Sequence, residues 1–217
     1  MNKLIKFGEN VDGYDIPVLN EREIRASAGI LFVLMFISLM LVQFKGNFLM
    51  IKYVIIVFLT DLIVRVFINP KFSPTLIIGR LIVNRQNPEY VGAAQKKFAW
   101  KIGIVLAGLM FFLLVMVNSY SIITGVTCLI CLAFLFFESA FGICLGCLVY
   151  GWFYKKKAQH CPGEICDAKN KQDIQKISWM QIAVLLWLVL YVGFLVLFFN
   201  DHFNVSPNNL WSIIGSL

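Results

Sequence analysis

The chain alternates long apolar runs with short polar segments, and the lengths of the runs predict a bundle of membrane helices. Four runs reach the roughly 20 residues that a helix needs to cross a bilayer. They are Ala26–Phe44, Phe48–Ile68, Ala99–Val117 and Trp179–Phe199. A fifth run, Tyr120–Phe153, is longer, and we expect one helix there that extends beyond the membrane at its cytoplasmic end. The sequence therefore predicts an all-α membrane protein with about five transmembrane helices.

A short segment between the second and third spans has a different pattern. Residues 75–86 set apolar side chains on one side of a helix against Arg80 and Arg85, and the segment is too short to cross a bilayer. Pro74 separates it from the second span and Pro88 follows it. We expect an amphipathic helix that lies in the membrane interface.

The polar segments between the spans indicate the orientation of the bundle. Lysine and arginine are frequent in residues 69–101 and 154–178, whereas the other connections and the tail after Asn200 contain almost none. By the positive-inside rule, the amino terminus then lies in the cytoplasm and the carboxyl terminus outside. The expected parts are a cytoplasmic leader, a four-span core that includes the interfacial helix, a cytoplasmic loop with cysteines, and the fifth span with an outer tail: residues 1–25, 26–153, 154–178 and 179–217.

The composition agrees with this class and narrows the function. Of 217 residues, 59% are hydrophobic and only 14% are charged, which is too apolar for a soluble domain. In a membrane protein a net charge of +7 is explained by cytoplasmic loops and anionic headgroups, so we expect no nucleic-acid partner. No glycine-rich phosphate loop, nucleophile elbow or zinc-protease motif is present, which leaves nucleotide and conventional hydrolase chemistry unsupported.

Three charged residues inside the predicted spans are candidates for function, because charge is costly in a bilayer. Asp61 and Arg65 are one helical turn apart and can pair. Counting ~1.5 Å per residue along each helix gives Arg65 and Glu138 similar depths, near the inner interface, so these two can also meet. The three residues either connect helices or serve a functional site.

All six cysteines lie between Tyr120 and Cys166. Cys128 and Cys131 fall in the apolar part of the long helix on the same side as Glu138, and we interpret them as packing residues. In a straight helix Cys144 and Cys147 fall on nearly the opposite side, at the membrane edge.

Cys144 and Cys147 combine with Cys161 and Cys166 in the pattern C-x2-C-x13-C-x4-C, close to the lysines of residues 155–157. Thiols gathered at a cytoplasmic face favour thiol redox or sulfur-transfer chemistry, and nearby cations stabilise thiolates. The spacing is also near that of zinc sites, so the same four cysteines are the candidate metal ligands. The third possibility is that the four are unrelated.

Six segments of the chain carry a family resemblance: Ile16–Glu23, Phe67–Pro70, Pro88–Ala93, Gln95–Trp100, Phe137–Cys147 and Cys161–Gly163. Through these segments the chain resembles a bacterial integral-membrane family known only as domain of unknown function 4395, over roughly Glu9 to Cys166. The resemblance implies that Glu138 and the four cysteines at positions 144, 147, 161 and 166 matter, and it implies no settled activity.

These observations support one leading hypothesis and two alternatives. The leading one is a multi-pass protein of the bacterial inner membrane whose cysteines exchange electrons or sulfur with a soluble thioredoxin-like or sulfurtransferase protein. The first alternative is a non-enzymatic membrane module with a structural zinc ion bound by four cysteines. The second is a small-solute transporter that uses Arg65 and Glu138. In each case the lipid bilayer is a partner.

Overall fold

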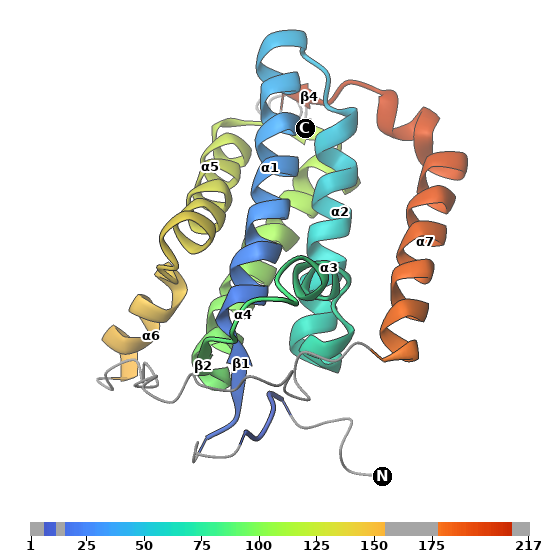
Figure 1. Cartoon of the computed structure of the whole chain (residues 1–217). Coiled ribbons are helices and arrows are strands. Elements are labelled where there is room, and N and C mark those ends of the chain that lie inside the picture. Colours follow the sequence, from blue (N-terminus) through green and yellow to red (C-terminus); the bar gives the residue numbers. More distant parts are fainter. Residues whose placement is uncertain (1–6, 12–15, 155–177, 210–217) are drawn as a thin grey trace.

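The structure is a computed structural model, and it describes residues 7–11, 16–154 and 178–209. Within these residues the chain forms α-helices whose longer members run side by side (Figure 1). They are α1 (Glu21–Lys45), α2 (Leu49–Ile63), α3 (Pro74–Ile82), α4 (Ala93–Met110), α5 (Ile122–Phe136), α6 (Leu145–Tyr154) and α7 (Trp179–Asn204). Among the described residues, four helical segments are long and apolar enough to cross a membrane: Glu21–Lys45, Ala93–Met116, Ile122–Phe141 and Trp179–Asn204. The predicted all-α class is confirmed, and the number of apolar helices roughly agrees with the expected five.

The first helix begins earlier than its apolar run. Asn20 is the N-cap of α1, and its side chain accepts a hydrogen bond from the Arg22 amide. Just before it, β1 (Val18–Asn20) pairs antiparallel with β2 (Tyr90–Gly92), which leads into α4. This strand pair holds the starts of α1 and α4 together at one end of the bundle, and α1 begins at Glu21, five residues before the apolar run that starts at Ala26.

The second and third spans continue into π-helical turns. Helix α2 is extended by η1 (Val64–Ile68) and α4 by η3 (Phe111–Met116). Between the two spans, a 3-10 turn, η2 (Pro70–Phe72), is followed by α3, which packs across α1. The helix predicted over residues 75–86 is thus present but shorter, and its Arg80 is buried against α1.

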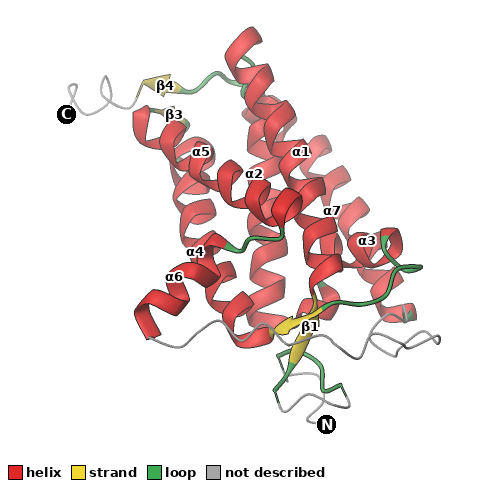
Figure 2. Ribbon diagram, turned by 60° about the vertical axis from the view of Figure 1, so that its left-hand side comes forward, coloured by secondary structure: helices red, strands yellow, loops and turns green. Residues whose placement is uncertain are grey.

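The predicted single helix Tyr120–Phe153 is wrong. Helix α5 passes into a π-helical turn, η4 (Phe137–Phe141), and the helix then ends at Gly142, whose φ is +68°. Because a left-handed residue cannot continue a right-handed helix, the chain turns there and a separate helix, α6, begins at Leu145. Figure 2 shows the bend between α5 and α6.

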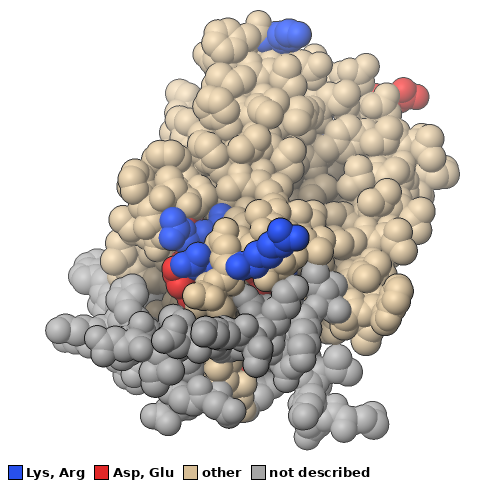
Figure 3. Space-filling model, in the orientation of Figure 1, with Lys and Arg blue, Asp and Glu red and all other residues tan. Residues whose placement is uncertain are grey.

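The core lies among α1, α2, α4 and α5, while α7 packs on α2 and α3. At the end of the bundle opposite β1, β3 (Ser119–Tyr120) pairs with β4 (Asn208–Asn209), and the buried Lys52 donates to the Val205 carbonyl at 2.8 Å. These contacts attach the end of α7 to the bundle. On the face drawn in Figure 3, a few charged side chains lie at this end of the bundle and a group of basic side chains lies near the opposite end. A broad band without charged side chains separates them.

Candidate functional site

Cys144 and Cys147 lie at the bend between η4 and α6. Cys144 directly precedes α6 and Cys147 is in its first turn. The two cysteines form a disulfide with their Cα atoms 5.1 Å apart, and both are buried. Cys161 and Cys166 lie outside the described residues. Of the predicted group of four cysteines, the structure therefore brings together the first pair.

Two backbone amides in the first turn of α6 donate hydrogen bonds to Cys144. The Cys147 amide donates to Cys144 Sγ at 3.2 Å, and the Leu148 amide donates to the Cys144 carbonyl at 3.1 Å. Cys144 thus occupies the N-cap position, where the first amides of a helix have no partner within the helix. The amino-terminal end of a helix carries partial positive charge, so this position stabilises a thiolate.

Gly146, between the two cysteines, allows α6 to contact α4 closely. A Cβ atom at Gly146 would lie 2.6 Å from the Ala99 Cβ and 2.8 Å from its Cα. These distances exclude any larger residue unless the backbone moves. The absence of a side chain at Gly146 therefore allows the segment with the disulfide to pack closely against α4.

Glu138, in η4, pairs with a lysine that the sequence assigned to a loop. Lys96 Nζ lies 2.5 Å from Glu138 Oε1 and 2.8 Å from Glu21 Oε2. The contact between Arg65 and Glu138 that their similar depths allow is not among the ion pairs of the described residues: Arg65 pairs with Asp61. Helix α4 begins at Ala93 and so brings Lys96 into the bundle between α1 and η4, where it pairs with Glu138. Equal depth along two helices does not fix which sides of them face each other. Lys96 lies in the Gln95–Trp100 segment that carries the family resemblance, but nothing in the sequence indicated that it pairs with Glu138.

Asp61 and Arg65 form the predicted pair. Arg65 Nε donates to Asp61 Oδ2 at 2.7 Å, and both side chains are buried. Three buried hydroxyls complete the cluster. Arg65 Nη2 lies 2.5 Å from Ser27 Oγ and 2.6 Å from Thr75 Oγ1, and Ser73 Oγ donates to Asp61 Oδ1 at 2.7 Å. The cluster connects α1, α2 and the start of α3, which favours a helix-joining role for this pair.

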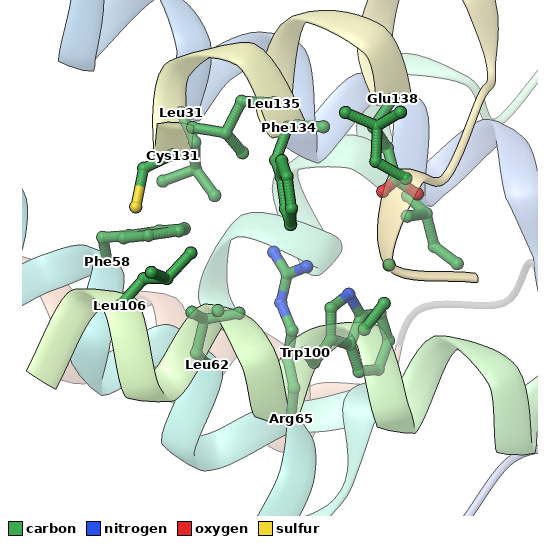
Figure 4. A pocket seen from close by; sticks show the side chains of 16 residues that line it. Leu31, Phe58, Leu62, Arg65, Trp100, Leu106, Cys131, Phe134, Leu135 and Glu138 are labelled. Carbon is green, nitrogen blue, oxygen red and sulfur yellow. The ribbon is translucent and has the colours of Figure 1, made fainter. Parts of the chain in front are cut away.

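A cavity of about 60 Å³ lies inside the bundle, and both Arg65 and Glu138 line it. Figure 4 shows Cys131 and Glu138 at opposite ends, with the Arg65 guanidinium between Phe134 and Trp100. The guanidinium lies 5.1 Å from the centre of the Trp100 ring. A cavity of this size with polar groups can hold a few water molecules. Gly146 also lines the cavity, so the cavity borders the Cys144–Cys147 segment.

Cys128 and Cys131 are buried free thiols, and Cys128 Sγ contacts Met35 Sδ at 3.7 Å. Their surroundings agree with the packing role predicted for them.

The described residues do not form a metal site. Among them, no group of three or more histidine, cysteine, aspartate or glutamate side chains is placed to hold a metal ion. Cys144 and Cys147, the two described members of the proposed zinc site, are bonded to each other, whereas zinc requires free thiolates.

Fold and site together indicate an α-helical membrane protein with a C-x-x-C disulfide at the start of a short helix. The chain belongs to the family described as domain of unknown function (DUF4395), which matches residues 19–155. The resemblance stated from the sequence is therefore confirmed, over a somewhat shorter range. The match includes Glu138, Cys144 and Cys147 and ends before Cys161 and α7. No curated protein and no solved structure matched the chain.

Proposed function

We propose that this is a multi-pass protein of a bacterial inner membrane that exchanges electrons with a soluble dithiol protein through Cys144 and Cys147. The observation that carries the proposal is the disulfide between these cysteines in the first turn of α6, with the Cys147 amide directed at Cys144 Sγ. A dithiol pair at a helix N-terminus suits reversible exchange, because the helix stabilises the departing thiolate. The same geometry favours redox exchange over sulfur transfer.

The proposed exchange transfers two electrons in two thiol–disulfide steps. One thiolate of the partner attacks Cys144 Sγ, so the Cys144–Cys147 bond breaks and Cys147 leaves as a thiolate. The partner's second thiol then attacks its own first sulfur, and Cys144 leaves the mixed disulfide. Two electrons and two protons pass from the partner to this protein, which becomes a dithiol while the partner becomes a disulfide. Cys161 and Cys166 are proposed as a second dithiol pair that can exchange with the first within the chain.

The proposal is tested by trapping the mixed disulfide. In a Cys147→Ser variant, the Cys144 thiolate attacks the disulfide of the oxidised partner, which is the reverse of the second step, and forms the mixed disulfide. Cys147 is no longer present to displace the partner, so the crosslink should accumulate. Cells are quenched with acid, thiols are alkylated, and the protein is run on a non-reducing gel. Cys144→Ser should trap much less, and Cys128→Ser, which alters a buried thiol elsewhere, should trap nothing. If the Cys147→Ser and Cys128→Ser variants give the same gel pattern, the exchange proposal is wrong.

A structural zinc site remains the first alternative, with Cys144, Cys147, Cys161 and Cys166 as ligands. It predicts a stoichiometric metal content in purified protein that falls in every single cysteine variant, without any crosslink. Elemental analysis of the same variants therefore separates the two functions.

Transport of a small solute is the second alternative, and the cavity favours it, because Arg65 and Glu138 both line a space inside the bundle. At about 60 Å³ the cavity limits such a solute to the size of a few water molecules. Uptake by vesicles containing the protein would test it, with Glu138→Gln expected to reduce the rate.

A further inference from the structure

An open groove lies on the outside of the bundle between α1, the residues after α3, and η4. Its volume is about 440 Å³, and its polar lining consists of Arg22, Arg25, Gln86, Glu89 and Ser139. Arg22 and Arg25 are on the same side of α1, three residues apart. The groove and the internal cavity have no lining residue in common, and neither Cys144 nor Cys147 lines the groove.

The two arginines differ in how their charges are balanced. Arg22 Nη2 forms an ion pair with Glu89 at 2.6 Å, and Arg22 Nη1 donates to Gln86 Oε1 at 3.0 Å. Arg25 makes a long hydrogen bond, 3.4 Å, to the Ala140 carbonyl, and within the described part of the chain no carboxylate forms an ion pair with it. Glu89 thus pairs with Arg22, whereas Arg25 interacts with a described carboxylate, that of Glu21, only through its charge at longer range.

Apolar side chains are exposed on the elements at either side of the groove. Leu81 and Ile82 of α3 are 45% and 60% exposed, and Phe141 of η4 is 59% exposed. On the face drawn in Figure 3, the basic group also borders the band without charged side chains. A cationic group that has no close ion pair among the described residues, beside exposed apolar surface, matches a phospholipid, whose phosphate and acyl chains need both.

We propose that this groove binds the phosphate of an anionic phospholipid, with Arg25 as its charged contact. The Ser139 hydroxyl lines the groove but donates its proton to the Phe136 carbonyl at 3.1 Å, so Arg25 carries the recognition. The lipid's acyl chains then lie over the exposed apolar residues of α3 and η4. Arg22 contributes less, because Glu89 already holds its guanidinium. A guanidinium donates two parallel hydrogen bonds to a phosphate, which a lysine cannot do.

The test uses the full-length protein in non-ionic detergent, titrated with short-chain phosphatidylglycerol or phosphatidylcholine and analysed by native mass spectrometry. Wild-type protein should bind phosphatidylglycerol more tightly, and Arg25→Gln should weaken that binding about tenfold, as expected for one charged contact. Lys45→Gln removes the same charge from the opposite end of α1 and should have no effect. Equal weakening by both variants would mean that general charge, and not this groove, attracts the lipid.

Two further measurements control for misfolding of the Arg25→Gln variant and distinguish a lipid phosphate from free phosphate. Arg25→Lys keeps the charge and should bind with intermediate affinity, so it reports on the groove even if Arg25→Gln is poorly folded. Inorganic phosphate at the same concentration as the lipid should not displace it, because phosphate alone makes no apolar contact. Full displacement by inorganic phosphate would overturn the lipid assignment in favour of a site for free phosphate.

Discussion

Lys96 connects three segments of the bundle through two carboxylates. Its Nζ lies 2.8 Å from Glu21 on α1 and 2.5 Å from Glu138 on η4, while the lysine itself belongs to α4. The lysine side chain is 1% exposed and the carboxylates 14% and 15%, so solvent screens the charges weakly. The cluster has two negative charges for one positive charge, and its stability therefore depends more on the lysine than on either glutamate.

We predict that Lys96→Met destabilises the protein much more than Glu138→Gln. Removing the lysine leaves two buried carboxylates facing each other, at a cost of about 3–5 kcal/mol in unfolding free energy. Removing the Glu138 charge leaves an intact pair between Lys96 and Glu21, at a cost of about 1–2 kcal/mol. Thermal unfolding in detergent measures both variants.

The double variants test the partners. Adding Glu138→Gln to Lys96→Met should recover part of the loss, because one unpaired charge disappears. Arg65→Gln combined with Glu138→Gln should give a nearly additive loss, since Arg65 pairs with Asp61 instead. Strong coupling between Arg65 and Glu138, with none between Lys96 and Glu138, would contradict the structure.

At this scale the sequence predicts spacing along a helix better than partners across helices. The pair of Asp61 and Arg65 follows from a separation of four residues, which any helix brings together. The partner of Glu138 does not follow, because a count of residues gives depth but not the direction in which a side chain points. The C-x-x-C pair was marked by its spacing, whereas its position at a helix N-cap depends on a bend that the sequence did not indicate.

Among the elements, α1 and α3 are in close contact at Gly79. A Cβ atom there would lie 2.6 Å from the Glu23 carbonyl oxygen and 3.2 Å from the Ser27 amide nitrogen. One residue later, Arg80 Nη2 forms a buried ion pair with Glu23 Oε2 at 3.0 Å. The glycine therefore allows the short helix to lie close enough for this pair to form.

We predict that Gly79→Ala is destabilising although alanine favours helices. In an open position the change gains about 1 kcal/mol of helix propensity, but here the methyl group meets α1 backbone, which must move. The expected net loss is about 1–3 kcal/mol. Gly108→Ala is the matched control, because nothing lies within 4 Å of a Cβ atom at that position of α4. The control should match or exceed wild-type stability in thermal unfolding, and a stabilised Gly79→Ala would show that the helices are not in close contact.

The elements that the sequence missed are those set by local backbone geometry. The run from Tyr120 to Phe153 contains no proline, so nothing in its apolar pattern marks the end of η4, the continuation of α5, at Gly142. The strands β1 and β2 have three residues each, too few for an alternating pattern to stand out, and they pair across 69 or more residues of sequence. The amphipathic pattern predicted α3 but placed Arg80 on the outside, because it could not include the buried partner Glu23.

For the whole molecule the prediction of class was reliable, because bilayer thickness imposes a length on every apolar run. Helix α7 illustrates this: Leu190 and Leu197 are 72% and 83% exposed, which suits lipid but not water. The orientation of the bundle stays a prediction from charge. The described end with β1 and α3 carries most of the lysines and arginines, whereas the opposite end has an exposed Lys45 and a buried Lys52.

We predict that the end with β1 and α3 lies in the cytoplasm, because loops rich in lysine and arginine are retained there. Two exposed positions report on the two ends: Asn87, after α3, and Ser206, after α7. A membrane-impermeant maleimide should label Ser206→Cys in intact cells whose outer membrane, if present, has been made permeable. Asn87→Cys should gain label over the parent chain only after lysis, and the native Cys161 and Cys166 should react only then. Labelling of Asn87→Cys but not Ser206→Cys in intact cells would reverse the orientation and move the proposed exchange site to the outer side.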